Sequence, residues 1–177
     1  MFYYTCGNPR VCNNQLKQHE ESALYNRILV PLDGSKLAEC VLPHVKEIAS
    51  GCRIASVTLI SAVDEVHLPT RGGIALSADA LKQIEKTSEN EAAGYLNGIK
   101  KDLEGAGLNV EICVVKGKAA EVIARYATDN NFDMIVIATH GRSGISRWVW
   151  GNVADKLLRS ACVPVFMIRA PGCVPGI

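Results

Sequence analysis

The sequence has no long hydrophobic run: no stretch approaches the roughly 18 apolar residues that a membrane-spanning helix needs. Its first 22 residues lack the continuous apolar core of a secretion signal, so we expect a cytoplasmic protein. An excess of charge of one sign is also missing, because 19 basic and 18 acidic residues leave a formal net charge of +1. Nucleic acids and anionic membranes usually bind to a concentrated basic face, so neither is an expected partner.

Several catalytic and metal-binding patterns are absent as well. No Gly-Lys-Ser or Gly-Lys-Thr occurs, which excludes the P-loop of many nucleotide hydrolases. The run from Gly141 to Gly144 is one residue short of the Gly-x-Ser-x-Gly elbow of serine hydrolases. Cys6, Cys12 and His19 match no common zinc spacing and lack a fourth ligand. The sequence therefore predicts no catalytic residue and no metal site of its own.

The seven cysteines are scattered through predicted helices, strands and tails, and their number is odd. A disulfide framework usually has an even number of cysteines and belongs to a much shorter secreted chain. We therefore expect most of them to be reduced and to serve as small buried hydrophobic residues.

A single folded domain is expected, since 177 residues with 48% hydrophobic composition can form one full core but are few for two. We place this domain at residues 25–170. Residues 1–24 are polar and aperiodic, which predicts an N-terminal extension with little regular structure. Residues 171–177 are expected to form a C-terminal tail.

Within the domain, the spacing of apolar residues alternates between that of strands and that of helices. Five aliphatic runs predict strands, at residues 27–32, 54–63, 110–114, 134–138 and 163–168. Four segments predict helices, at residues 35–50, 81–103, 120–127 and 149–158, and residues 64–79 predict a loop. Pro43 should kink the first helix or lie in its tight first turn, and Pro164 favours a strand start or an edge strand.

This alternation of strand and helix implies a parallel sheet with helices on both sides, which is a doubly wound α/β fold. In such a sheet, ligands bind outside the carboxyl ends of the strands, where the winding direction reverses. The residues at the ends of the strands are therefore the candidates for chemistry. They are Asp33 after the first strand, Ala62 and Val63 at the end of the second, and residues 139–144 after the fourth.

The fourth predicted strand leads into a turn with two glycines, and nine residues separate Gly141 from Gly151 before the last helix. Glycine lets the backbone approach a ligand closely, and the free amides at a helix start favour phosphate. Asn152 can cap the helix or donate to a phosphate oxygen, while Asp33 can accept hydrogen bonds from a ribose or a base. Nucleotide binding is one interpretation of this pattern. Because glycine turns after strands are common, a purely structural turn is the other.

Other side chains near this turn also have two interpretations. His140 is either a general base or, more commonly, a hydrogen-bonded structural group at a strand end. Arg142 and Arg147 either contact phosphates or are solvated on an exposed loop. Trp148 and Trp150 either stack on a ligand or are buried against a neighbouring protomer.

The chain resembles the universal stress protein family over residues 27–169. The resembling stretches are RILVPLDGSKLAECVLPHV, VTLISAVD and DMIVIATHGRSGISRWVWGNVADKLLRSACVPVFMIR. ATP-binding members share a motif of glycine, two residues, glycine, nine residues, glycine, then serine or threonine. In this chain the motif falls on Ala138, Gly141, Gly151 and Asn152, so its first and last positions differ. Because asparagine keeps a donor and a capping group, we expect a weaker or altered phosphate contact rather than its loss.

The resemblance implies a five-stranded doubly wound parallel sheet in the order 3-2-1-4-5, with two helices on each face. This is a Rossmann-like fold of the adenine nucleotide alpha hydrolase type. The resemblance also implies that Asp33 contacts the nucleoside, that the backbone of Ala62 borders adenine, and that a homodimer forms through the last strand, at Val163, Val165 and Met167. The nucleotide-binding residues predicted in this way are Pro31, Leu32, Asp33, Ala62, Ile137, Ala138, His140, Gly141, Arg142, Ser143, Gly151, Asn152 and Val153.

The expected function is that of a stress-response module that binds an adenine nucleotide, which is ATP, ADP or AMP, with Mg²⁺ accompanying ATP. Since the sequence offers no dedicated base, any ATP hydrolysis should be slow. The competing hypothesis is a dimeric scaffold of the same fold that binds no nucleotide, because part of the family lacks the motif. A nucleotide-dependent transferase is a third hypothesis, without a second-substrate motif to support it.

Overall fold

Strands and helices follow one another in turn along the chain. The structure is a computed structural model that describes residues 25–64, 78–139 and 152–170, so the predicted extension and tail lie outside the described residues. The elements in chain order are β1 (Arg27–Pro31), the 3₁₀ helix η1 (Ala38–Val41), α2 (Leu42–Gly51), β2 (Ser56–Val63), α3 (Ala78–Glu104), β3 (Val110–Lys116), α4 (Ala119–Asp129), β4 (Met134–Thr139), α5 (Asn152–Ser160) and β5 (Val165–Arg169).

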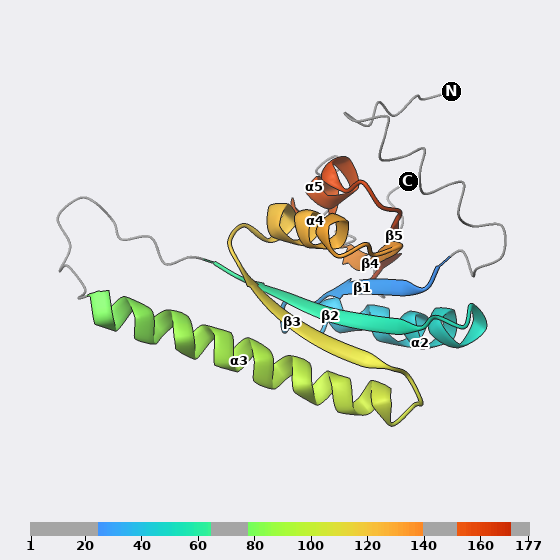
Figure 1. Cartoon of the computed structure of the whole chain (residues 1–177), viewed down its shortest axis with the longest axis horizontal. Helices are drawn as coiled ribbons and strands as arrows, with labels where there is room; N and C mark the ends of the chain where they lie inside the picture. Colours follow the sequence, from blue (N-terminus) through green and yellow to red (C-terminus); the bar gives the residue numbers. More distant parts are fainter. Residues whose placement is uncertain (1–24, 65–77, 140–151, 171–177) are drawn as a thin grey trace.

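The strands form one parallel sheet in the order β3-β2-β1-β4-β5. This confirms the predicted fold and strand order. β1 lies between β2 and β4, and the winding direction reverses at this position (Figure 1). Because all the strands are parallel, the carboxyl ends of β1, β2 and β4 meet at one edge of the sheet.

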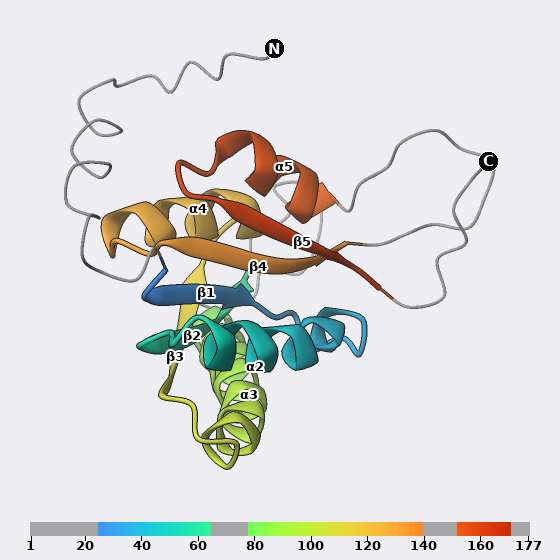
Figure 2. The same cartoon turned by 90° about the vertical axis from the view of Figure 1, so that its right-hand side faces the viewer.

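The sheet is the middle of three layers. Figure 2 shows α2 and α3 on one face of the sheet and α4 and α5 on the other. One core cluster joins α2 and α3 to the first face and includes the fully buried Val45 and Leu96. A second cluster joins α4 and α5 to the other face and includes the buried Ile123 and Leu157. The expected two helices on each face are confirmed, and η1 is an addition to the first face.

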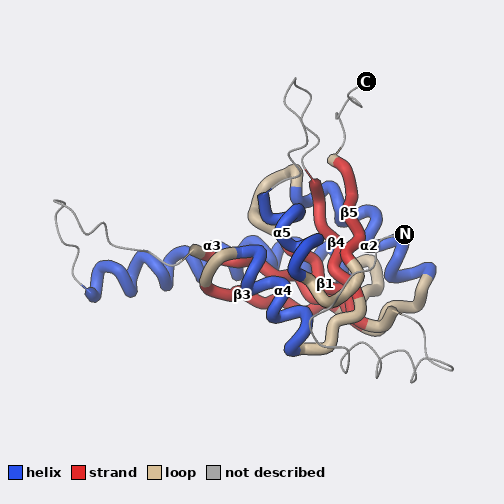
Figure 3. Tube along the Cα trace, turned by 90° about the horizontal axis from the view of Figure 1, so that it is seen from above, coloured by secondary structure: helices blue, strands red, loops and turns tan. Residues whose placement is uncertain are grey.

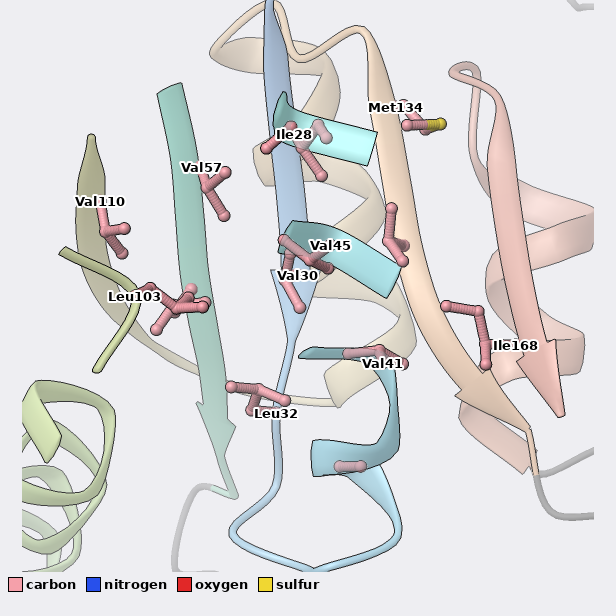
Figure 4. Packing of buried hydrophobic residues seen from close by; sticks show 14 of the residues in the cluster. Ile28, Val30, Leu32, Val41, Val45, Val57, Leu103, Val110, Met134 and Ile168 are labelled. Carbon is pink, nitrogen blue, oxygen red and sulfur yellow. The ribbon is translucent and has the colours of Figure 1, made fainter. Parts of the chain in front are cut away.

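The alternation of side chains explains why β4 is apolar along most of its length. Met134 and Val136 belong to the cluster under α2 and α3, which Figure 4 shows at close range. Ile135 and Ile137 belong to the cluster under α4 and α5. A strand that is covered on both faces needs apolar residues at successive positions, and this confirms the prediction of a buried strand here.

Two prolines decide where elements begin. The helix predicted from Ser35 is instead the short η1 followed by α2, with Pro43 in the first turn of α2. Proline is tolerated there because the first N–H groups of a helix have no intrahelical partner. Pro164 directly precedes β5, which therefore begins at Val165, two residues later than predicted. β5 is an edge strand, as Pro164 favoured.

The long helix α3 exceeds the length of the strands that it covers. It has 27 residues, whereas β2 has 8 and β3 has 7. The rise per residue makes α3 about 40 Å long, against roughly 26 Å for β2. Figures 1 and 3 show the first turns of α3 extending beyond the sheet. Neither α3 nor any other described helix is both long and apolar enough to cross a membrane.

The cysteines in the described segments are less buried than the sequence predicted. These cysteines are Cys40, Cys52, Cys113 and Cys162. None of the four is buried, since Cys52 and Cys162 are exposed and the other two are half-buried. Cys52 follows α2 and Cys162 precedes β5, so both lie in connecting segments at the surface, where side chains are exposed to solvent. The other three cysteines lie outside the described residues.

Candidate functional site

A pocket lies at the carboxyl edge of the sheet, where the end of β1 is beside the end of β4. Its volume is about 180 Å³. This is the switch point, at which open α/β sheets bind their ligands. The described residues that line the pocket are Pro31, Leu32, Asp33, Leu37, Ala38, Ile60, Ala62, Ala119, Ile123, Ile137, Ala138, Val153 and Ala154.

The connection from β1 to η1 forms the acidic side of the pocket. The backbone N–H of Leu32 donates to the carbonyl oxygen of Ile60 at 2.9 Å, which keeps the chain on the sheet one residue beyond β1. Gly34 has a φ of +81°, a value that favours glycine, and turns the chain away from the sheet. Asp33 Oδ1 accepts the N–H of Ser35 at 3.0 Å. This Asx turn holds the carboxylate of Asp33 at the exposed rim of the pocket.

Asp33 is the only charged side chain among the described residues that line the pocket. Its second carboxylate oxygen has no hydrogen-bond partner within the described segments. That oxygen can accept a hydrogen bond from a ligand hydroxyl or amine, and its charge would repel a phosphate. One carboxylate does not make a metal site, and no group of three or more His, Cys, Asp or Glu in the described part of the chain is placed to hold a metal ion.

The other walls of the pocket are apolar. β2 contributes Ile60 and Ala62, β4 contributes Ile137, and α4 contributes Ala119 and Ile123. The three isoleucines are buried, so they present a dry surface, while the two alanines leave room between the elements. A concave apolar wall with few polar groups suits the flat ring of a small organic ligand.

The start of α5 also borders the pocket. Val153 and Ala154 belong to the first turn of α5, which begins at Asn152, and both line the pocket. The first N–H groups of a helix have no intrahelical partner and lie at the positive end of its dipole, so they favour an anion. The pocket therefore combines an acidic rim, an apolar wall and a helix start.

A tyrosine from α3 fixes η1 at the rim of the pocket. The Tyr95 hydroxyl donates to Glu39 Oε1 at 3.3 Å, and Lys36 Nζ lies 2.8 Å from Glu39 Oε2. Burial raises the pKa of Tyr95 to about 12, and the charge of Glu39 and its hydrogen bond act in the same direction. Tyr95 therefore stays protonated as a donor and links α3 to the element that carries Ala38 of the lining.

The structure brings many of the predicted site residues to this one pocket. Asn152 is the first residue of α5. His140, Gly141, Arg142, Ser143 and Gly151 were predicted for the site but lie outside the described residues. The predicted residues that line the pocket are Pro31, Leu32, Asp33, Ala62, Ile137, Ala138 and Val153.

Six lining residues were missed from the sequence: Leu37, Ala38, Ile60, Ala119, Ile123 and Ala154. The sequence predicted a site only from the ends of the first, second and fourth strands and from the start of the last helix. Two signals were available to extend it. Ile60 stands two residues before Ala62, so both side chains point to the same face of β2. The helix after the third strand also begins at the carboxyl edge of a parallel sheet, which places Ala119 there.

The strand order and the pocket at the switch point define the protein as an open, doubly wound α/β protein. A model of the Universal stress protein family matches residues 24–169. The chain therefore belongs to the universal stress protein family. Universal stress protein MJ0577 of Methanocaldococcus jannaschii is 28% identical over 158 residues, which cover 84% of this chain and 97% of that protein.

Solved structures have the same fold. The structure of MJ0577 has a TM-score of 0.66 at 26% identity and covers 84% of this chain and 99% of its own. A universal stress protein in complex with cAMP has a TM-score of 0.60 at 18% identity, over 84% and 99% of the two chains. A family protein from Arabidopsis thaliana with AMP bound has a TM-score of 0.59 at 15% identity, over 83% and 93%. The last two comparisons establish the fold alone.

Proposed function

We propose that the pocket at the switch point binds an adenine nucleotide and that the protein acts as a nucleotide-responsive module in the stress response. The lining of the pocket is the observation that carries this proposal. Seven residues that the sequence predicts for nucleotide binding lie around one cavity of about 180 Å³. They come from the ends of β1, β2 and β4 and from the first turn of α5, which are far apart in the sequence.

Each part of a nucleotide has a matching part of the pocket. The apolar surface of Ile60, Ala62 and Ile123 suits the adenine ring. Asp33 suits the ribose, because an ionised carboxylate forms strong hydrogen bonds with hydroxyl groups. The start of α5 suits the phosphates. We expect Mg²⁺ to enter the site together with ATP, bound to the phosphate oxygens, as is common in nucleotide sites.

Proteins of the same fold support the choice of ligand. One universal stress protein was solved in complex with cAMP and the Arabidopsis thaliana protein with AMP, so two adenine nucleotides are ligands of proteins with this fold. We propose binding rather than turnover as the role of this chain, and we expect any ATP hydrolysis to be slow. The cytoplasmic location expected from the sequence stays a prediction.

We also propose that the protein forms a homodimer through β5. Among the described strands, β5 pairs only with β4, so its outer edge has backbone groups that are free to pair with another chain. Phe166 on this strand is 45% exposed. Of the predicted interface residues, Val163 precedes β5, and Val165 and Met167 pack against the cluster under α4 and α5. We therefore add Phe166 to the proposed interface.

The proposal is tested first on the purified protein without added nucleotide. The protein is denatured, and any released small molecule is identified by chromatography and mass spectrometry. An adenine nucleotide in near-stoichiometric amount supports the proposal and identifies the bound species. A protein that releases nothing and also fails to bind ATP with Mg²⁺ in calorimetry overturns it and leaves the scaffold hypothesis.

A matched pair of variants tests the position of the site. We expect Asp33→Ala to weaken nucleotide binding by about tenfold or more, because a hydrogen bond to a charged group contributes about 1.5–3 kcal/mol. Asp64→Ala is the control, since Asp64 directly follows β2 at the same edge of the sheet, is exposed, and does not line the pocket. Equal affinities of the two variants would contradict the proposed position.

A further inference from the structure

The two halves of α3 are held to the domain by different interactions. From Tyr95 onward the helix belongs to the core, with Leu96 and Leu103 buried. Leu96 is the first buried residue among the described side chains of α3, and Ile84 in the first half is 42% exposed. Figures 1 and 3 show the first half projecting past the sheet. The first half therefore lacks the hydrophobic anchor of the second.

A charged contact holds the first half of α3 instead. Lys116 Nζ, at the carboxyl end of β3, is 3.2 Å from Glu85 Oε2 and 2.5 Å from Glu89 Oε1. Glu85 and Glu89 are four residues apart and lie on one face of the helix, so both carboxylates reach the same ammonium group. Hydrogen bonds to Glu89 and Glu85 raise the pKa of Lys116, so the group stays charged. We call this three-residue contact the Lys116 clasp.

Two glycines weaken α3 near the junction of its halves, since Gly94 directly precedes Tyr95 and Gly98 lies one turn into the second half. A Cβ atom added at Gly94 or at Gly98 would meet no heavy atom of the described residues within 4 Å, so close packing among them does not require glycine at either position. Glycine in the interior of a helix lowers its stability relative to alanine. The first half of α3 can therefore detach or unwind without disturbing the buried second half.

The clasp is directly connected to a wall of the pocket. Lys116 is the last residue of β3, and the N–H of Gly117 donates to the carbonyl oxygen of Val63 at 3.0 Å. Gly117 has a φ of +116°, and a Cβ atom there would lie 3.0 Å from Val122 Cγ1, so the turn has little freedom. Ala119 follows two residues later and lines the pocket. Because this turn is stiff, a shift of the Lys116 backbone would be transmitted to Ala119.

We propose that the first half of α3 is a regulatory arm, and that its docking on the Lys116 clasp positions the β3–α4 turn and thereby tunes the affinity of the pocket. The inference rests on the proposed nucleotide site and adds its regulation. Because the three side chains of the clasp are 31–45% exposed, salt screens the contact, and high ionic strength releases the arm.

Amide hydrogen exchange, measured by mass spectrometry without nucleotide, tests the clasp and its coupling to the turn. In Lys116→Met we expect exchange to be about threefold to tenfold faster at residues 79–90, because two partly exposed ion pairs are lost. Exchange should also rise at residues 119–123 and stay unchanged at residues 95–104. Wild type in high salt should show the same pattern.

Lys118→Met is the matched control. Lys118 belongs to the same turn, but its side chain is 81% exposed, and its one ion pair among the described residues is with Glu121 of α4, at 3.8 Å. We expect its exchange at residues 79–90 to equal that of the wild type. Unchanged exchange of these residues in Lys116→Met, or an equal rise in both variants, overturns the clasp. A rise at residues 79–90 without one at residues 119–123 overturns the coupling.

Calorimetric titration with ATP tests the effect on the site. We expect Lys116→Met to weaken ATP binding by about twofold to fivefold, and Lys118→Met to leave it unchanged. Lys116→Glu should weaken binding further, and adding Glu89→Lys should restore part of the loss by re-forming one ion pair. Equal affinity of Lys116→Met and wild type overturns the regulatory role. If the wild type binds no adenine nucleotide, the proposed function fails, while the exchange comparison still decides the clasp and its coupling.

Discussion

At the scale of single residues, Asp133 joins the start of β4 to the start of β1. Asp133 Oδ2 accepts the backbone N–H of Asn26 at 2.8 Å and that of Arg27 at 2.9 Å. We expect Asp133→Ala to lower the free energy of unfolding by about 1–3 kcal/mol, because two partly buried donors lose their partner. Urea denaturation measures the change. Asp129→Ala, at the exposed end of α4, is the control, and an equal effect of the two substitutions would contradict this role.

Two tyrosines should ionise only at high pH. Burial raises the pKa of both Tyr95 and Tyr126 to about 12, with a further contribution from Glu39 and from Cys113 respectively. In the folded protein each pKa is above the ordinary value of 10.0. The contribution of each protonated hydroxyl to the free energy of unfolding is therefore complete below about pH 10 and is lost as the pH rises towards 12. Ultraviolet absorbance of the phenolate, followed together with circular dichroism, measures this. Replacement of either tyrosine by phenylalanine should remove one of the two late steps in the absorbance titration. Complete ionisation of both tyrosines near pH 10 in the folded protein would disprove the expectation.

At the scale of elements, the glycines at positions 94 and 98 make α3 less stable than alanine would at the same positions. Gly94→Ala and Gly98→Ala should each raise the free energy of unfolding by about 0.5–1 kcal/mol, since the added methyl group meets no neighbour within 4 Å in the described part of the chain. Gly117→Ala is the opposite case, because its φ of +116° and the 3.0 Å approach to Val122 make a side chain costly. Thermal or urea denaturation of the three variants should give two increases and one decrease. A decrease for Gly94→Ala would mean that an unrecognised contact needs glycine there.

At the scale of the whole molecule, the proposed homodimer places its interface on β5. We expect the wild type to sediment as a dimer and Phe166→Lys to sediment as a monomer, because a charge would replace the exposed ring on the edge strand. Ile84→Lys is the control, since Ile84 is a similarly exposed apolar residue on α3, with 42% against 45% exposure. A monomeric wild type, or a dimer that survives Phe166→Lys, would refute the proposed interface.

Much of the fold was predictable from local patterns. The strands β1, β2 and β4 are short aliphatic runs, and their apolar character follows from burial on both faces. The strand order followed from the resemblance to a family and not from local periodicity, because periodicity does not determine which strands pair. The start of β5 was predicted two residues early, since the apolar Val163 precedes Pro164, which cannot donate a hydrogen bond to the sheet.

Part of the candidate site was also predictable from the sequence. Asp33 and Ala62 were identifiable because ligands of parallel sheets bind where strands end, and the sequence by itself determined the positions of those ends. Only the tertiary structure decided that Ile123 of α4 lines the same pocket, and that Lys116 meets Glu85 and Glu89. Periodicity determines which face of a helix or strand is apolar. Which residues from distant segments come into contact depends on how the helices pack across the sheet, and a local sequence window does not contain that information.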